Sequence, residues 1–366
     1  MALKVAIVGL PNVGKSTLFN ALTQTAAAQA ANYPFCTIEP NVGDVAVPEP
    51  RLDALARIAK SKEIIPARIN FVDVAGLVRG ASKGEGLGNQ FLSHIRDCDA
   101  VAFVARCFED GDITHVEGRV DPLADLEIIE TELMLADLES LEKRVPNLEK
   151  RAKAGGDKES ATALRLVNLA LAELNAGRPA RAAKVSAEDE KAWRMLQLLT
   201  AKPALYVGNV DEGAAEHGNA LSDLVAERAT RDNAKAVVIS AKIESEIAML
   251  DPAERGEFLE TMGLSEPGLN RLIHEAYALL GLQTYFTAGP KESRAWTIPI
   301  GATAPQAAGV IHTDFEKGFI RAETIAYDDY VKLKGEAGAR EAGRMRSEGK
   351  DYVVQDGDVM NFRFNV

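Results

Sequence analysis

The sequence predicts an α/β protein with a parallel sheet, an inserted helical arm and a small α+β module at its C-terminal end. Apolar runs of five or six residues, such as 100–105, recur up to residue 240 between amphipathic stretches, which is typical of a buried parallel sheet. Between residues 122 and 200, apolar residues instead repeat every three or four positions. From residue 282 onward, short strands and turns replace the helices. We therefore expect one domain over 1–281, interrupted by a helical insertion at 122–200, and a second domain over 282–366.

Length and composition limit the possible classes of protein. The chain has 366 residues, more than one ordinary core holds, and a net charge of −12. This charge argues against broad binding to nucleic acid, and we expect no DNA partner. No apolar run approaches the roughly 20 residues of a membrane span, so we expect no membrane partner. Cys36, Cys98 and Cys107 follow neither a disulfide nor a zinc pattern, which fits a reducing cytoplasm.

Residues 3–17 carry the main motif of the chain. An apolar strand runs into Gly9-x-x-x-x-Gly14-Lys15-Ser16, and an amphipathic stretch follows, so the order is strand, glycine loop, helix. Such a loop turns its backbone N–H groups inward to bind phosphate, and the positive end of the helix dipole lies behind it. Lys15 would reach the β- and γ-phosphates, and the Ser16 hydroxyl would bind Mg²⁺. The motif predicts a P-loop nucleotide site.

Two later segments supply further groups for this site. Thr37 lies in a proline-containing loop after the first helix, where we expect it to bind Mg²⁺ and the γ-phosphate, the alternative being an ordinary loop residue. The strand 68–73 ends in Asp73, whose carboxylate would hold a water on Mg²⁺. Gly76 follows and would let its N–H approach the γ-phosphate closely. The Asp-x-x-Gly pattern is weak alone but strong at this distance after a P-loop.

Residue 77 is a leucine, where many GTPases carry the glutamine that orients the attacking water. A leucine neither donates nor accepts a hydrogen bond, so another group must position the water. His115 lies in a polar loop after the strand 100–105, on the edge where open α/β sheets bind ligands. It is our candidate for this role, and the alternative is a structural loop histidine.

The insertion predicts an antiparallel coiled-coil hairpin with Gly155-Gly156-Asp157 at its turn. We expect Pro146 to kink the first helix, which would be about 30 residues long. The apolar positions that step by three and four are Met134, Leu138, Leu141, Val145 and Leu148, then Leu164, Val167, Leu171 and Leu174. Basic residues lie toward the free end of the hairpin: Lys143, Arg144, Lys150, Arg151, Lys153 and Lys158. They suit a partner such as RNA, and a solvated helix face explains them about equally well.

The base side of the site is expected after a strand at 203–208. Asn209-Val210-Asp211-Glu212 follows it, at the place of the guanine-reading Asn-Lys-x-Asp of GTPases. A valine replaces the lysine whose stem stacks on the base, and a glutamate replaces the aspartate, so strict selection of guanine is not expected. Ser240-Ala241-Lys242, after another strand, is a GTPase-like feature and favours selection of guanine.

The C-terminal module is expected to be rich in short strands, at 296–300, 318–322 and 352–355, with a hairpin turn at Asp356-Gly357. Met360, Phe362, Phe364 and Val366 then alternate with polar residues, as in a strand with one buried face. Nothing in this module looks catalytic.

Four long segments resemble one family, the YchF proteins or Obg-like ATPases. They are Gly9-Leu-Pro-Asn-Val-Gly-Lys-Ser, Asn32-Tyr-Pro-Phe-Cys-Thr-Ile-Glu-Pro-Asn, Asp73-Val-Ala-Gly-Leu-Val-Arg-Gly-Ala-Ser-Lys-Gly-Glu-Gly-Leu-Gly-Asn-Gln-Phe and Gln283-Thr-Tyr-Phe-Thr-Ala-Gly. The resemblance covers essentially the whole chain. It implies a P-loop NTPase fold with an Obg-type G domain, a helical coiled-coil arm, and a C-terminal TGS domain with an α+β β-grasp fold.

The resemblance also implies an activity and its residues. It implies slow hydrolysis of ATP in preference to GTP, and binding to the ribosome, large subunit and 70S, with rRNA contacts through the arm and the TGS domain. Carried over by position, it places Ser16 and Thr37 on Mg²⁺, Asn209 and Val210 against the adenine, and His115 on the attacking water. The residues implied for the phosphates are Asn12, Val13, Gly14, Lys15, Ser16 and Thr17. Asn12 also resembles the asparagine with which some Obg-class relatives hold K⁺.

Three hypotheses follow. The first is a slow, Mg²⁺-dependent ATPase acting as a nucleotide switch on the ribosome, in translation or stress regulation, with Lys15, Gly76 and His115 as the catalytic set and Glu212 and Ser240 on the base side. The second is a GTP-preferring Obg-type regulator. The third is a non-catalytic RNA- or protein-binding adaptor.

Overall fold

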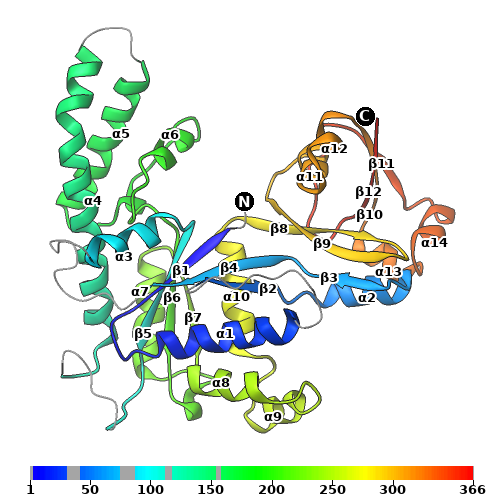
Figure 1. Cartoon of the computed structure of the whole chain (residues 1–366), viewed down its shortest axis with the longest axis horizontal. Coiled ribbons are helices and arrows are strands. Elements are labelled where there is room, and N and C mark those ends of the chain that lie inside the picture. Colours follow the sequence, from blue (N-terminus) through cyan, green and yellow to red (C-terminus); the bar gives the residue numbers. More distant parts are fainter. Residues whose placement is uncertain (1–2, 31–41, 75–86, 112–117, 154–157, 366) are drawn as a thin grey trace. The chain divides into compact units, whose positions relative to one another are not determined.

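The computed structural model describes residues 3–30, 42–74, 87–111, 118–153 and 158–365, without the side chains of 25–30 and 87–90. Its contacts divide the chain into two compact units, residues 1–44 with 70–276, and residues 45–69 with 277–366 (Figure 1). The second unit therefore contains a segment from near the N-terminus that the sequence did not associate with it. Within the described residues, no helix combines the length and the apolar character needed to cross a membrane.

The first unit is built on a six-stranded sheet in the order β2-β4-β1-β5-β6-β7. Its strands are β1 (Lys4–Val8), β2 (Val42–Ala46), β4 (Arg68–Asp73), β5 (Ala100–Arg106), β6 (Ala204–Asn209) and β7 (Lys235–Ile239). The pairs β1/β4, β1/β5, β5/β6 and β6/β7 are parallel, and the register places Ile7 beside Asp73 and Arg106 beside Asn209. The chain therefore leaves these strands at one edge of the sheet, which confirms the predicted parallel α/β fold.

Helices of the first unit pack on this sheet and on one another. They are α1 (Lys15–Ala30), α3 (Leu87–Arg96), α7 (Ala220–Arg231), α8 (Ala241–Met249), α9 (Arg255–Thr261) and α10 (Gly268–Leu279). Helix α1 packs against α8, and α7 packs against β6 and β7. Asn219 starts α7 with a capping box, because its side chain accepts the N–H of Ser222 while the Ser222 hydroxyl accepts the N–H of Asn219.

The insertion forms the predicted hairpin. Helices α4 (Pro122–Lys153) and α5 (Lys158–Asn175) lie side by side as an arm (Figure 1). The 32 residues of α4 correspond to about 48 Å at 1.5 Å per residue. Pro146 lies inside α4, which continues through it. Buried residues from both helices and from the following α6 (Glu190–Met195) share one apolar cluster: Leu141, Leu166, Val167, Ala170, Leu174 and Trp193.

A buried ionic cluster, here called the arm-root cluster, fixes α4 to the sheet. It consists of Glu130 on α4, Arg181 in the short helix Ala180–Ala182, Tyr206 on β6, and Arg228 with Asp232 at the end of α7. The Glu130 carboxylate is paired with Arg181 and, at 2.5 Å, with Arg228. Arg228 also contacts Asp232 at 2.6 Å, and the Tyr206 hydroxyl lies 3.1 Å from Glu130 and 2.9 Å from Asp232.

Asp137 provides a second buried attachment two turns further along α4. Its carboxylate is fully buried and accepts the backbone N–H groups of Leu199 at 2.9 Å and Thr200 at 2.8 Å, and the Thr200 hydroxyl at 2.7 Å. Burial raises the pKa of Asp137, and these three hydrogen bonds oppose the shift. The arm is thus held at its base by side chains as well as by chain connection.

The second unit is a mixed sheet in the order β11-β10-β12-β8-β9-β3 with five helices on it. Its strands are β3 (Glu63–Ile65), β8 (Leu282–Ala288), β9 (Glu292–Pro299), β10 (Phe319–Ile325), β11 (Arg346–Glu348) and β12 (Val359–Phe364). Its helices are α2 (Pro50–Ala59), α11 (Ala304–Ile311), α12 (Thr313–Lys317), α13 (Tyr327–Lys332) and α14 (Glu336–Glu341). The predicted alternation along the last strand is confirmed at Met360 and Phe362, which are buried in the core of this unit.

Residues 45–69 are an integral part of this second unit. Strand β3 pairs in parallel with β9, and Leu52 and Leu55 of α2 are buried. Arg51 binds Glu49 at 2.6 Å and Asp356 at 2.7 Å, and its guanidinium lies over the Phe286 ring, 5.3 Å from the centroid. The C-terminal sheet therefore depends on a segment more than 200 residues away in sequence.

The prediction of a strand at 352–355 that forms a hairpin with the last strand is wrong. Val353 forms one isolated bridge with Thr303, and β12 pairs with β10 and β8 instead. Asp358 explains the difference, because its carboxylate accepts the Gln355 N–H at 2.9 Å and the Tyr352 hydroxyl at 2.7 Å. These bonds curl the segment before β12 begins.

Candidate nucleotide site

The glycine loop joins β1 to α1 at the carboxyl edge of the first sheet. A Cβ at Gly9 would lie 2.8 Å from Val13 Cγ2 and 2.9 Å from the Val104 carbonyl oxygen, so no side chain fits there. Gly14 has a φ of +90°, and Asn12 a φ of +64°, both in the left-handed region. The Leu18 N–H donates to the Gly14 carbonyl at 2.9 Å and opens the helix. The local conformation is that of a phosphate-binding nest.

Lys15 and Asp73 meet at this loop. The Lys15 side chain is 7% exposed, and its ammonium donates to the Asp73 carboxylate at the end of β4. Ser16 and Thr17 lie exposed in the first turn of α1. The site thus combines the cation expected to bind phosphate with the carboxylate and hydroxyl oxygens expected near a metal.

These groups fit Mg²⁺. Hydroxyl and carboxylate oxygens are ligands that Mg²⁺ prefers, and it usually takes one or two protein carboxylates together with phosphate oxygens and water. Among the described residues there is no cluster of three or more His, Cys, Asp or Glu able to hold a metal. Ser16 and Asp73 are the described residues that would hold Mg²⁺ on the protein side, and their ligation of it stays a prediction.

Asn209, at the end of β6, ties the loop to the base side of the site. Its side-chain amide donates to the Val13 carbonyl at 2.9 Å and accepts the Ala241 N–H at 2.9 Å. A Cβ at Gly14 would lie 2.1 Å from the Asn209 amide nitrogen, which explains why a glycine stands there. Val210 is buried, and its N–H donates to Ile239. Contact of Asn209 and Val210 with an adenine stays a prediction.

Glu212 and Ser240 occupy the same side. Glu212 is ion-paired with Lys242, and this hydrogen bond lowers the pKa of the Glu212 carboxyl. Ser240, at the end of β7, is 2% exposed, and its hydroxyl has no hydrogen-bond partner in the part of the chain that the structure describes. Thr37, Gly76 and His115 lie outside the described residues.

One charged residue at this edge was not singled out from the sequence. Arg106 ends the otherwise apolar strand β5, is 1% exposed, and lies beside Asn209 in the sheet register. Its signal in the sequence is a basic residue that closes a wholly apolar strand on the ligand-binding edge.

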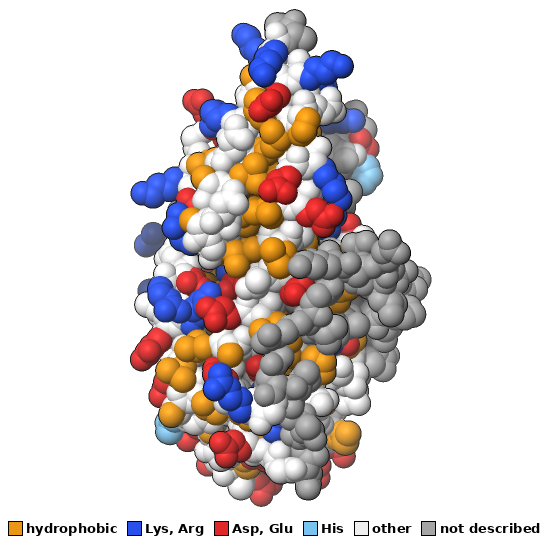
Figure 2. Space-filling view, turned by 90° about the vertical axis from the view of Figure 1, so that its left-hand side faces the viewer, with side chains coloured by type: hydrophobic (Ala, Val, Ile, Leu, Met, Phe, Trp, Pro, Cys, Tyr) orange, Lys and Arg blue, Asp and Glu red, His pale blue; other side chains and the backbone are white. Residues whose placement is uncertain are grey.

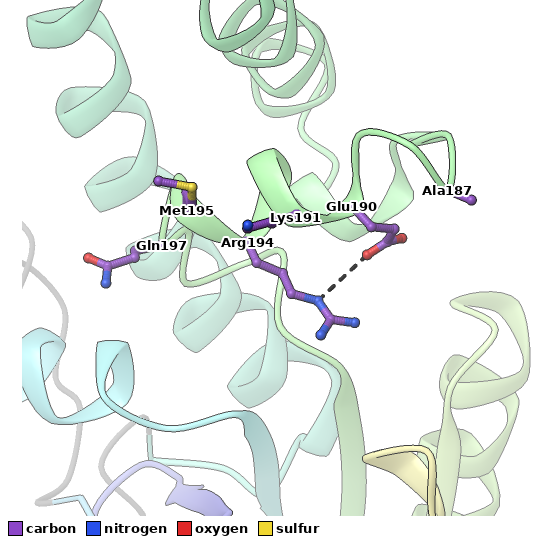
Figure 3. Close-up of a pocket in the computed structure, with 6 residues that line it drawn as sticks. All are labelled: Ala187, Glu190, Lys191, Arg194, Met195 and Gln197. Carbon is purple, nitrogen blue, oxygen red and sulfur yellow. Dashed lines mark ion pairs between the residues drawn. The ribbon is translucent and has the colours of Figure 1, made fainter. Parts of the chain in front are cut away.

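A hollow of about 590 Å³ beside α6 is a separate feature (Figure 3). It contains the Arg194–Glu190 ion pair, with a nitrogen–oxygen distance of 3.7 Å. Its lining comes from one short helix and its flanks: Ala187, Glu190, Lys191, Arg194, Met195 and Gln197. It shares no residue with the P-loop site, so we do not assign the nucleotide to it.

Comparison with known proteins identifies the family. Residues 4–136 match the model of a 50S ribosome-binding GTPase (MMR_HSR1), and residues 282–365 match YchF-GTPase_C, described as a protein of unknown function (DUF933). The chain is 57% identical over its whole length, and that of the relative, to the protein named ribosome-binding ATPase YchF of Escherichia coli O157:H7. The chain belongs to the YchF family.

Other YchF proteins agree with this assignment. The ribosome-binding ATPase YchF of Bacillus subtilis is 54% identical, and that of Mycoplasma genitalium is 46% identical, each over all of both chains. The solved structure of the Schizosaccharomyces pombe YchF GTPase matches with a TM-score of 0.87 and 38% identity, covering 99% of this chain and 97% of that one. The G domain and the C-terminal domain are those of a YchF protein.

Proposed function

We propose that the protein is a slow, Mg²⁺-dependent ATPase that acts as a nucleotide switch on the ribosome in the cytoplasm. The observation that carries the proposal is the meeting of Lys15 and Asp73 at the mouth of the glycine loop. The loop supplies backbone N–H groups and one cation for phosphate, and Ser16 and Asp73 supply oxygen ligands on its rim.

The residues divide the work as follows. When the nucleotide binds, the Lys15 ammonium leaves Asp73 and contacts the β- and γ-phosphates. This contact neutralises negative charge on the phosphoryl group that is transferred. Bound Mg²⁺ would neutralise charge on the same phosphates, held on the protein side by Ser16, Asp73 and Thr37. Gly76 approaches the γ-phosphate through its N–H. Asn12 is our candidate ligand for K⁺.

Slow turnover follows from Leu77. A site that positions the γ-phosphate without the usual glutamine leaves water orientation to His115 and much of the rate enhancement to a partner.

ATP and GTP are the two candidate nucleotides for the base side of the site. Val210 in place of lysine and Glu212 in place of aspartate favour ATP, as do the names of the bacterial relatives. GTP is the second candidate, because the fission yeast relative is named a YchF GTPase and because an ionised Glu212 lies beside Lys242.

Titration with fluorescent ATP and GTP analogues in Mg²⁺ buffer separates the two. We expect ATP to bind more tightly than GTP, because the groups that read guanine's N1/N2 edge are altered at 209–212. Equal or reversed affinities contradict the ATPase proposal. Phosphate release no higher than the buffer blank, even with ribosomes and K⁺, indicates a non-catalytic adaptor.

The relatives' names support a ribosomal partner, and the arm offers a surface for rRNA. Lys and Arg side chains gather around the free end of the arm (Figure 2). Lys150, Arg151 and Lys153 there are exposed. In a chain of net charge −12, a local basic surface is what contact with RNA phosphate requires. The C-terminal TGS domain is the second proposed contact.

Reversing the charge of Lys150, Arg151 and Lys153 to glutamate is expected to weaken cosedimentation with 70S particles and large subunits at least tenfold. Repulsion from RNA phosphate replaces attraction, so the loss should shrink as salt is raised. The matched control reverses three exposed basic residues away from the tip, Lys184, Lys191 and Arg194, and should bind normally. If the variant with reversed charges at Lys150, Arg151 and Lys153 binds as wild type does, the ribosome contact lies in the C-terminal domain instead.

A further inference from the structure

Lys242 is a charged side chain to which the proposed mechanism gives no role. It is the second residue of α8, and its ammonium is ion-paired with the Glu212 carboxylate. The positive end of a helix dipole disfavours a cation in the first turn, so the helix itself does not favour a lysine there. The partner of this lysine matters, because Glu212 stands at the guanine-reading position of GTPases.

The two segments that carry the ion pair are fixed next to each other. The Ala241 N–H donates to the Asn209 side-chain oxygen at 2.9 Å, which attaches the start of α8 to the end of β6. Asp211 caps the short helix Glu212–Ala214, because its carboxylate accepts the Ala214 N–H at 3.1 Å. These hydrogen bonds set where the two paired side chains leave the backbone.

The ion pair leaves the Glu212 carboxylate ionised but occupied. The hydrogen bond from Lys242 lowers the pKa of the Glu212 carboxyl and raises the pKa of the Lys242 ammonium, to which the charges of Glu246 and Asp110 add. To read guanine, a carboxylate accepts the N1 and N2 hydrogens with its two oxygens. Lys242 contacts one of these oxygens, Oε1 of Glu212, and so competes with guanine for it.

We propose that Lys242 is a specificity-determining residue: by pairing with Glu212 it keeps that carboxylate from guanine and so favours ATP over GTP. This inference rests on the proposed ATPase function and deepens it. The two side chains are 68% and 38% exposed, and exposed ion pairs are weak, so the effect on selection is limited to about fivefold. The GTPase-like Ser-Ala-Lys sequence thus contributes a lysine that acts against guanine.

The test measures the dissociation constants of ATP and GTP analogues for wild type and Lys242→Met with Mg²⁺ present. Methionine keeps the stem and removes the charge, and any lost attraction to the phosphates cancels in the ratio Kd(GTP)/Kd(ATP). We expect this ratio to fall about two- to fivefold, because the freed carboxylate accepts guanine's N1 and N2 hydrogens and repels the N1 lone pair of adenine. Lys242→Arg should keep the wild-type ratio, since a guanidinium also pairs with a carboxylate. An unchanged ratio in Lys242→Met overturns the proposal.

Lys235→Met is the matched control. Lys235 is exposed at the first residue of β7, the opposite end of this strand from Ser240. The substitution removes the same charge from the same unit of the chain, and the ratio should equal that of wild type. A fall as large as in Lys242→Met would trace the effect to net charge and would contradict the proposal.

ITP and a double variant test the route through Glu212. Hypoxanthine lacks the N2 amino group of guanine, so Lys242→Met should tighten the binding of GTP more than that of ITP. Adding Glu212→Gln removes the charged acceptor and should return the ratio to the wild-type value. Equal gains for GTP and ITP, or a gain that survives in the double variant, would rule out Glu212 as the route.

Failure of the proposed function looks different from failure of this inference. A wild-type protein that binds GTP as tightly as ATP contradicts both. A wild-type protein that prefers ATP, with the same ratio in Lys242→Met, overturns this inference alone. Phosphate release no higher than the buffer blank refutes hydrolysis alone, because the ratio of dissociation constants is read without turnover.

Discussion

Replacing Lys15 with alanine is expected to lower kcat/KM for nucleotide hydrolysis at least about a thousandfold. Two separate effects of the lost ammonium contribute to this fall. The variant loses the cation that stabilises charge on the transferred phosphate, a contribution of about 10²–10³ when one such group is removed. It also leaves the Asp73 carboxylate, 17% exposed, without the ammonium that it contacts in the structure. That unpaired negative charge then faces the incoming phosphates. Steady-state phosphate release and nucleotide titration measure both effects.

The double variant Lys15→Ala/Asp73→Asn separates the two effects. Removing the negative charge as well should restore part of the nucleotide affinity in the absence of Mg²⁺, because the repulsion is gone, while hydrolysis stays absent. Affinity as low as in Lys15→Ala alone would mean that Asp73 does not repel the phosphates. A single Lys15→Ala variant with hydrolysis within tenfold of wild type would exclude the P-loop as the catalytic site.

Replacing Glu130 with alanine is expected to give the largest loss of stability in the arm, about 3–5 kcal/mol, the usual cost of removing one partner of a buried ion pair. The Glu130 side chain is 3% exposed and contacts Arg181 and Arg228. Its loss removes a carboxylate partner from two mostly buried guanidinium groups, although Arg228 keeps Asp232 and Arg181 keeps the Tyr206 hydroxyl. Urea unfolding, monitored by circular dichroism, measures the change in the free energy of unfolding.

Glu139→Ala is the matched control on the same helix. Glu139 contacts only Lys143 among the described ion pairs, at 2.5 Å, and both side chains are more than half exposed. Exposed pairs of this kind contribute little, so its unfolding midpoint should match that of wild type. Equal midpoints for the two variants would mean that the arm-root cluster does not stabilise the fold.

The sequence predicted the elements whose signals are local. The P-loop strand and helix, the apolar strands at 68–73, 100–105 and 203–208, and the helical hairpin are in place, because each has its own periodicity or glycine spacing. The contacts that assemble the site were not predictable in this way. Asn209 binds the carbonyl of Val13, 196 positions earlier, and a base-side motif gives no hint of that bond.

Other features were not predicted because the residues they contact are far away in the sequence. Pro50 in the first turn and the apolar spacing of Leu52 and Leu55 indicate helix α2, but nothing local says that it belongs with the C-terminal sheet. Strand β3 has only three residues, too few for a periodic signal. The hairpin expected at Asp356-Gly357 failed because a side chain, Asp358, bonds the preceding backbone.

Residues 45–69 also determine whether either part of this protein can be expressed separately. Expressing the chain only to residue 281 would strip β3 of β9 and leave Arg51 without Asp356 and the Phe286 ring. A fragment starting at 282 would in turn lack α2, with its buried leucines. Neither part keeps its core without the other, so replacing the C-terminal part with another domain would also require changes in the stretch that joins the Thr37 loop to Asp73.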